Sequence, residues 1–159
     1  MNELKFHKFD GTYIDNISEY VDKWIKDHPY CTVTIGCDSQ KHSRHIQYAV
    51  SIVMHNVDEY GIGKGAHCIY ATVIDKNKQL KKDIYTKLWG EVVIAVEAAK
   101  IIEKCGKKIT IHLDYNSDES YMSNVLYSSG IGYASSFGFK AYGKPDAFCA
   151  SIVSDKLCR

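Results

Sequence analysis

The chain lacks a hydrophobic run long enough to cross a membrane, and it carries no excess of charge of either sign. A spanning helix needs roughly 18 or more apolar residues in succession, and no segment has such a run. Residues 1–5 lack the apolar stretch of a signal peptide. The 20 Lys and Arg residues balance 19 Asp and Glu residues, which argues against a protein that holds long nucleic acid by counterion release alone. We expect no membrane partner.

The sequence also lacks a Cys-x-x-Cys pair, an internal repeat, a linker and a low-complexity segment. His42-x-x-His45 and His67-Cys68 could contribute zinc ligands, but neither has a second half-site at the right spacing. Several cysteines fall on apolar positions, so free buried thiols in a reducing, cytoplasmic compartment fit best. We expect residues 1–159 to form a single domain, because this length is enough for a substantial core. The six cysteines are Cys31, Cys37, Cys68, Cys105, Cys149 and Cys158.

Two short runs of alternating apolar and polar residues each end in an aspartate. In residues 31–38 the odd positions are apolar and the even positions are small or polar, and the run ends at Asp38. Residues 109–114 repeat this pattern and end at Asp114. Because side chains alternate across a strand, each aspartate lies on the polar face of its predicted strand.

The segment before the second run predicts that the two strands are parallel neighbours. Residues 84–104 contain no Gly or Pro except Gly90, and they predict a helix that Cys105-Gly106 closes. A strand, a crossover helix and a parallel strand form a right-handed unit in nearly all known cases. The carboxylates of Asp38 and Asp114 would then meet at one end of the sheet, where two acids favour a divalent cation between them.

Glu91 is a third candidate ligand within the predicted helix. Its helical row is otherwise apolar, and an acid in an apolar stripe is costly unless it is paired or coordinates an ion. The alternative is that Glu91 lies at the edge of a broad stripe and reaches water. Glu97, in contrast, belongs to a row that is expected to be solvated. The row of Glu91 also contains Leu88, Ala95, Ala98 and Ile102.

The remaining segments complete an α/β fold with a mixed five-stranded sheet, in which three antiparallel strands precede parallel crossovers and helices flank the sheet. Asp146 is then an ordinary first-turn acid of the last helix, and Asp155 lies at the surface. The two are nine residues apart and cannot both face one site. The predicted elements are a helix around 16–27, strands at 46–54 and 66–74, a helix at 120–129 stopped by Gly130, a strand at 132–139, and a helix from Pro145.

This order of elements, with its acids, resembles the ribonuclease H-like superfamily. Several motifs are similar to the bacterial YkuK-like family, a ribonuclease H-like group of unassigned function, from about residue 6 to the C-terminus. The motifs are Ile35-Gly-Cys-Asp-Ser-Gln40, Ile111-His-Leu-Asp114, Gly138-Phe-Lys-Ala141, Lys144-Pro-Asp-Ala147, Ala150-Ser151 and Asp155-Lys156.

The resemblance implies a metal-dependent nuclease site in which four acids are both catalytic residues and metal ligands. By position these are Asp38, Glu91, Asp114 and Asp146. Carboxylates suit Mg²⁺ or Mn²⁺, and Asp38 would bridge two such ions about 4 Å apart. The metal ions would activate a water for attack on phosphorus and neutralise the leaving oxygen.

Substrate contacts are expected near the same end of the sheet. Lys41 and Arg44 form a basic segment beside Asp38, and Lys144 precedes the Pro-Asp motif. Ser39 and Gln40 could contact a phosphate, or could simply satisfy backbone groups where the strand ends. A second basic segment, residues 76–82, is more simply a solvated turn.

Three functional hypotheses remain open. The first is metal-dependent hydrolysis of phosphodiester bonds in nucleic acid. Near-neutral charge favours weak binding of single strands, junctions or hybrids rather than plain duplex. The second is a non-catalytic module that binds nucleic acid or protein. The third is a nucleotide-binding relative of the actin-like ATPases, although those usually have two domains. The sequence leaves the oligomeric state open.

Overall fold

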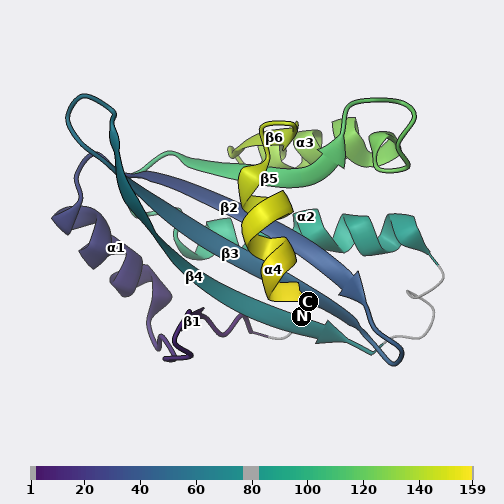
Figure 1. Cartoon of the computed structure of the whole chain (residues 1–159), viewed down its shortest axis with the longest axis horizontal. Coiled ribbons are helices and arrows are strands. Elements are labelled where there is room, and N and C mark those ends of the chain that lie inside the picture. The colour runs from purple at the N-terminus through teal and green to yellow at the C-terminus, as the bar shows by residue number, and fades with distance from the viewer. Residues whose placement is uncertain (1–2, 77–82, 159) are drawn as a thin grey trace.

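The computed structural model describes residues 3–76 and 83–158, and within them it contains a mixed six-stranded sheet with helices on both faces (Figure 1). The basic residues 77–82 lie outside the described part. The strand order is β1-β4-β3-β2-β5-β6. No described helix is both long and apolar enough to span a bilayer. The strands are β1 (His7–Lys8), β2 (Thr32–Lys41), β3 (Ile46–Val57), β4 (Gly63–Asp75), β5 (Ile109–Asn116) and β6 (Lys140–Lys144).

Strands β2, β3 and β4 form the predicted antiparallel meander, and β5 and β6 add parallel strands on the other side of β2. The prediction of five strands was one short, because β1 pairs with β4 through only two residues. A two-residue strand has no measurable periodicity, so the sequence contains no signal for it.

Helices cover the sheet unequally. On one face, α2 (Ile84–Ile101) crosses behind β2 and α3 (Asn124–Ser136) lies behind β5 and β6 (Figure 1). Among the described residues, the other face carries only the C-terminal segment, a π-helix η1 (Cys149–Ser154) that continues into α4 (Asp155–Cys158) over β2 and β3. Helix α1 (Ile17–Asp27) inserts Val21 and Ile25 into the common core.

The core lies between the sheet and α2. A row of four fully buried isoleucines crosses four neighbouring strands, and the register pairs each with the next. Burial of so many β-branched side chains on one face stabilises the sheet and determines its register, because a slip by one residue would turn every side chain to the other face. From β4 to β5 the row contains Ile69, Ile52, Ile35 and Ile111.

Three predictions for the C-terminal third were wrong. Helix α3 runs through Gly130 instead of stopping there, and the strand that was expected at 132–139 lies at β6. The reason is packing: Gly130 is buried against Tyr115, so its missing side chain serves close contact and not helix termination. The last helix does not begin at Pro145 either. Asp146 N donates a hydrogen bond to Gly143 O in a turn, and η1 begins only at Cys149.

Two glycines of α3 provide a test of this packing. A Cβ at Gly130 would lie 2.7 Å from Tyr115 Cε2, and that ring is held by burial and by its hydroxyl bond to Leu88 O. A Cβ at Gly132 meets no atom within 4 Å. We expect Gly130→Ala to lower the free energy of unfolding by about 1–3 kcal/mol and Gly132→Ala to raise it by up to ~1 kcal/mol, from overpacking and helix propensity respectively. Urea unfolding measures both, and stabilisation by both variants would contradict the described position of α3.

Candidate acidic active site

Asp38 and Asp114 lie next to each other at the point where two parallel strands separate. The β2–β5 pairing runs in register from Val33–Ile109 to Cys37–Leu113, so each aspartate is the next residue on its strand. Beyond this point β2 continues along β3 while β5 turns towards β6 (Figure 1). The predicted adjacency and shared face of the two strand ends are therefore confirmed.

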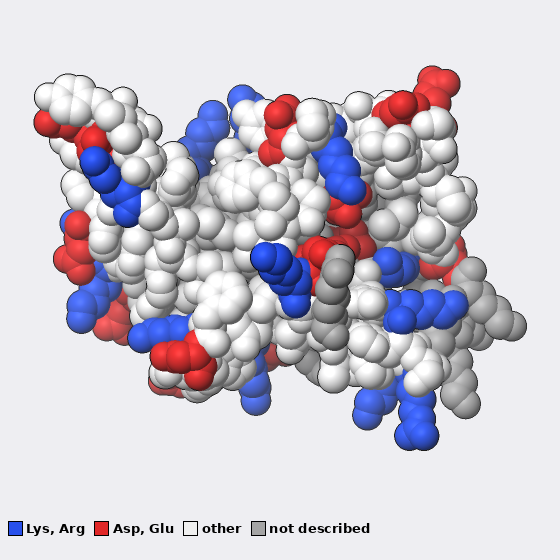
Figure 2. Space-filling model, viewed as in Figure 1, with Lys and Arg blue, Asp and Glu red and all other residues white. Residues whose placement is uncertain are grey.

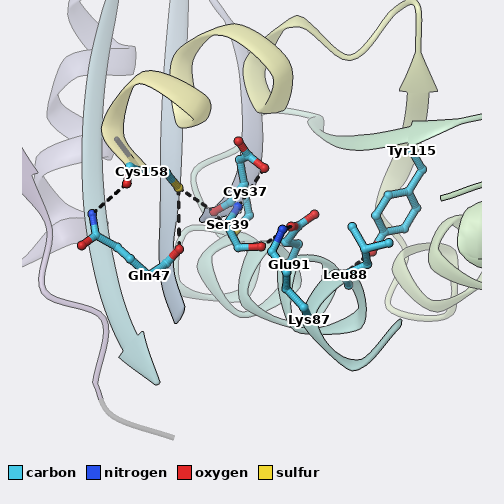
Figure 3. Close-up of polar contacts among 9 residues, drawn as sticks. Cys37, Ser39, Gln47, Lys87, Leu88, Glu91, Tyr115 and Cys158 are labelled. Carbon is cyan, nitrogen blue, oxygen red and sulfur yellow. Dashed lines mark hydrogen bonds and ion pairs between the residues drawn. The ribbon is translucent and has the colours of Figure 1, made fainter. Parts of the chain in front are cut away.

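Glu91 reaches the same region from α2, on the opposite face of the sheet. It is 1% exposed, which decides against the alternative that it reaches water. Ser39 Oγ donates a hydrogen bond to Glu91 Oε1, and Lys87 Nζ lies 3.9 Å from the same oxygen (Figure 3). The second carboxylate oxygen, Oε2, is buried and has no hydrogen-bond partner among the described residues. Burying such an oxygen without a partner costs free energy, so this carboxyl group has room for one more interaction.

Burial and mutual repulsion disfavour the charged forms of two of these acids. Burial, with the nearby charges of Asp38 and Asp114, raises the pKa of Glu91 to about 8, although the Ser39 bond acts against this. Burial, with the charges of Asp114 and Asp155, raises the pKa of Asp38 to about 6, although the Ser39 N–H bond to Oδ1, at 2.8 Å, opposes it. At neutral pH Glu91 is therefore mostly protonated.

Asp114 has a cation as its partner. Lys144 Nζ, at the end of β6, lies 2.8 Å from Asp114 Oδ1. This oxygen is buried and accepts no well-directed hydrogen bond, so the ion pair is what compensates its charge. On the face that carries α4, acidic side chains gather near the centre with Lys and Arg side chains around them (Figure 2).

The C-terminal segment adds a further acid. Cys158 Sγ donates a hydrogen bond to Asp38 O at 2.9 Å, and Gln47 Nε2 donates to Leu157 O at 3.3 Å, so α4 is attached to β2 and β3. This attachment brings Asp155 close enough for its charge to raise the pKa of Asp38. Asp155 is half-buried, whereas the sequence had suggested a surface position.

Asp146 is exposed in the turn after β6, and its charge acts on His112, where it opposes the lowering of the His112 pKa by burial. It lies outside the last helix because η1 begins only at Cys149. The charges of Asp114 and Asp155 act on Asp38, and those of Asp38 and Asp114 act on Glu91. The part of Asp146 in the site stays a prediction.

The predicted substrate contacts differ in accessibility. Gln40, Lys41 and Arg44 are exposed at the end of β2 and in the following turn. Ser39 is 6% exposed, and its hydroxyl donates to Glu91 Oε1. Lys144 is paired with Asp114.

Sequence reasoning missed Lys87, although its spacing of four residues from Glu91 was a usable signal. Nothing in the sequence pointed to the attachment of Cys158 to Asp38.

The carboxylates of the site are ligands that suit a hard divalent ion, but they are not arranged around a common point where such an ion could bind. Three carboxylates with an unpartnered oxygen are the ligand type that Mg²⁺ or Mn²⁺ prefers. However, within residues 3–76 and 83–158 no three His, Cys, Asp or Glu side chains are arranged so that they could hold a metal ion together. The bonds from Ser39 to Glu91 and from Lys144 to Asp114 occupy two of the carboxylates.

The raised pKa of Glu91 predicts how the stability of the metal-free protein depends on pH. A folded-state pKa above the ordinary value means that the contribution of Glu91 to stability is complete below pH 4.5 and is lost as pH rises towards 8. In EDTA, between roughly pH 6.5 and 8.5, we expect wild-type protein to lose about 2 kcal/mol of unfolding free energy relative to Glu91→Gln. Urea unfolding at the two pH values measures this.

Glu97→Gln is the matched control, because Glu97 lies on the same helix and is half-exposed. This variant should retain the wild-type pH dependence. If Glu91→Gln retained it too, Glu91 would already be ionised in the folded protein, and the description of a crowded, protonated site would be wrong.

Comparisons with known proteins bear on the fold. No curated protein matches the chain in sequence. Among solved structures it is similar to the N-terminal RNase H domain of rv2228c from Mycobacterium tuberculosis, determined as a fusion with maltose-binding protein. The identity is 11%, over 80% of this chain and 94% of that one, with a TM-score of 0.36. That score is too low to support an argument. A family model described as Ribonuclease H-like matches residues 12–159. The chain therefore belongs to the ribonuclease H-like family.

Proposed function

We propose that the protein is a metal-dependent phosphodiesterase that acts on nucleic acid. The observation that supports this most strongly is Glu91, which is fully buried, lacks a partner for Oε2 and lies beside Asp38 and Asp114 in a ribonuclease H-like chain. A buried acid with raised pKa next to like charges is typical of a functional site, because a purely structural role would favour an apolar residue at this position.

Each residue has a defined task in this proposal. Asp38, Glu91 and Asp114 would hold Mg²⁺ or Mn²⁺, and Asp155 takes the place that the sequence gave to Asp146. When bound, the metal supplies an activated water and neutralises the leaving oxygen. Ser39 keeps the Glu91 carboxylate oriented through its hydrogen bond to Oε1. Glu91 would have to lose its proton to hold the ion, because metal ligands must be deprotonated, whereas Asp38, with a pKa of about 6, is already mostly ionised at neutral pH.

The exposed cations at the end of β2 suit a phosphate backbone. Lys41 and Arg44 lie beyond Asp38 on the same strand and its turn, so they would bind phosphates that flank the scissile bond. Their number is small, which predicts weak binding with a short footprint. Single strands, junctions and RNA–DNA hybrids are therefore the proposed substrates, ahead of plain duplex.

A non-catalytic binding module is the second candidate. The observation that favours it is that the carboxylates are already bonded to Ser39 and Lys144, and that the described residues present no ready metal cluster. In this case the protein binds the same substrates through its exposed cations and does not cleave them. Cleavage assays separate the two candidates.

Activity should require the acids and depend on the cations. We expect Mn²⁺- or Mg²⁺-dependent cleavage at low salt that falls below detection in Asp38→Asn and Asp114→Asn. Lys41→Ala combined with Arg44→Ala should raise KM several-fold through weaker binding. Lys23→Ala with Lys26→Ala removes two exposed cations from α1 and should change KM little. Cleavage that survives Asp38→Asn would indicate a contaminant, and binding without cleavage would favour the module.

The assignment of the fourth acid is testable without activity. Mn²⁺ should raise the melting temperature, since a ligand that binds the folded state stabilises it. Asp155→Asn should reduce this rise, while Asp146→Asn, on the exposed turn, should leave it close to wild type. Differential scanning fluorimetry with and without Mn²⁺ gives the answer, and the reverse order of effects would restore Asp146 to the site.

A further inference from the structure

Two lysine side chains lie beside carboxyl groups of the acidic site. Lys144 Nζ lies 2.8 Å from Asp114 Oδ1, and Lys87 Nζ lies 3.9 Å from Glu91 Oε1. They approach from different elements, the end of β6 and the first turns of α2. An ammonium group beside a carboxylate provides the positive charge that a divalent ion would otherwise provide, and both cannot occupy the same oxygen.

The two lysines differ in their freedom to move. The Lys87 side chain is 22% exposed and lies one helical turn before Glu91. The Lys144 side chain is 41% exposed. Beside it is a hollow of about 370 Å³, lined by Asn116, Ser117, Lys144, Pro145 and Ser151.

The lining of this hollow suits an anionic oxygen group. Asn116 and Ser117 follow Asp114 at the end of β5, and Ser151 belongs to η1 on the other side. An ammonium group with amide and hydroxyl groups beside it is a typical partner of a phosphate. The Ser151 hydroxyl donates its hydrogen to Ala147 O. We therefore assign the donor role to Lys144 and the side chains of Asn116 and Ser117. In this hollow the Lys144 ammonium could bind a phosphate instead of Asp114.

We propose that Lys144 is an exchangeable counter-ion: it neutralises Asp114 in the ion-free protein, is displaced by Mg²⁺ or Mn²⁺, and then binds a substrate phosphate in the hollow. This inference rests on the proposed function, because it needs a divalent ion at Asp114.

Two consequences follow from competition for one oxygen. Lys144 lowers the affinity of the site for a divalent ion, because the ion must break the Asp114 pair. Conversely, the ion releases Lys144, so ion and phosphate strengthen each other's binding, and this coupling is reciprocal. A lysine with a purely structural role would also lower the ion affinity, but it would not strengthen phosphate binding when the ion is present.

Mn²⁺ titration calorimetry of the whole protein tests the first consequence. Lys144→Met keeps the length of the side chain and removes its charge, and it should bind Mn²⁺ about five- to tenfold more tightly than wild type. Lys140→Met is the matched control, because Lys140 is an exposed residue of the same strand whose ammonium lies over Tyr142 and not beside an acid. It should change the affinity less than about twofold, from long-range charge alone.

The outcomes separate this inference from the proposed function. If Mn²⁺ binding depends on Asp38 and yet is unchanged or weaker in Lys144→Met, the counter-ion role is overturned and the metal site stands. If wild type shows no Asp38-dependent Mn²⁺ binding, both are overturned. Lys144→Gln, together with circular dichroism, guards against a folding defect in the first variant, and the two substitutions should agree.

The second consequence is tested with a short phosphorothioate-linked oligothymidylate, which resists cleavage, in fluorescence anisotropy. Wild type should bind it several-fold more tightly in saturating Mn²⁺ than in EDTA. Lys144→Met should lose most of this gain, and Lys140→Met should keep it. A full gain in Lys144→Met, or the absence of any gain in wild type, would overturn the movement of Lys144 to the phosphate.

Discussion

The parallel pairing of β2 with β5 is the constraint on which the rest of the molecule depends. It places two aspartates at the same level, and it ends immediately before them, so that an acid from α2 can face both. The isoleucine row beneath α2 protects this arrangement. Any slip of register would bury polar side chains and remove Asp38 and Asp114 from their common face. Core packing and site geometry are therefore determined by the same few residues.

Concentrated negative charge is costly in such a place, and the surroundings show several compensations. Protonation, the Ser39 hydroxyl and two lysines each remove part of the repulsion. None of them removes the unpartnered oxygen of Glu91. Proteins commonly accept local instability where function requires it, and the remaining core offsets the cost. The side chains of this site therefore cost stability instead of adding to it. That cost is the physical reason for proposing a function here.

The sequence predicted the meander, the crossover helix and the adjacency of Asp38 and Asp114, because these depend on residue periodicity and chain connectivity. It predicted less of the last forty residues. Gly130 signals a helix end locally but is used for contact with Tyr115, a choice that only tertiary packing decides. The approach of Asp155 to Asp38 has the same origin. It depends on where η1 begins and on the bond between Cys158 and Asp38, and neither has a local signature.

The short strand β1 has a consequence for behaviour in concentrated solution. It pairs with Ile69 and Tyr70 in the middle of β4, a thirteen-residue strand on the border of the sheet. Unpaired strand borders are templates for association between molecules, and a brief covering strand interrupts such a template. Because β1 lies three strands away from β2, it contributes to colloidal behaviour rather than to the chemistry of the acids. Loss of residues 7–8 should therefore reveal itself first as aggregation.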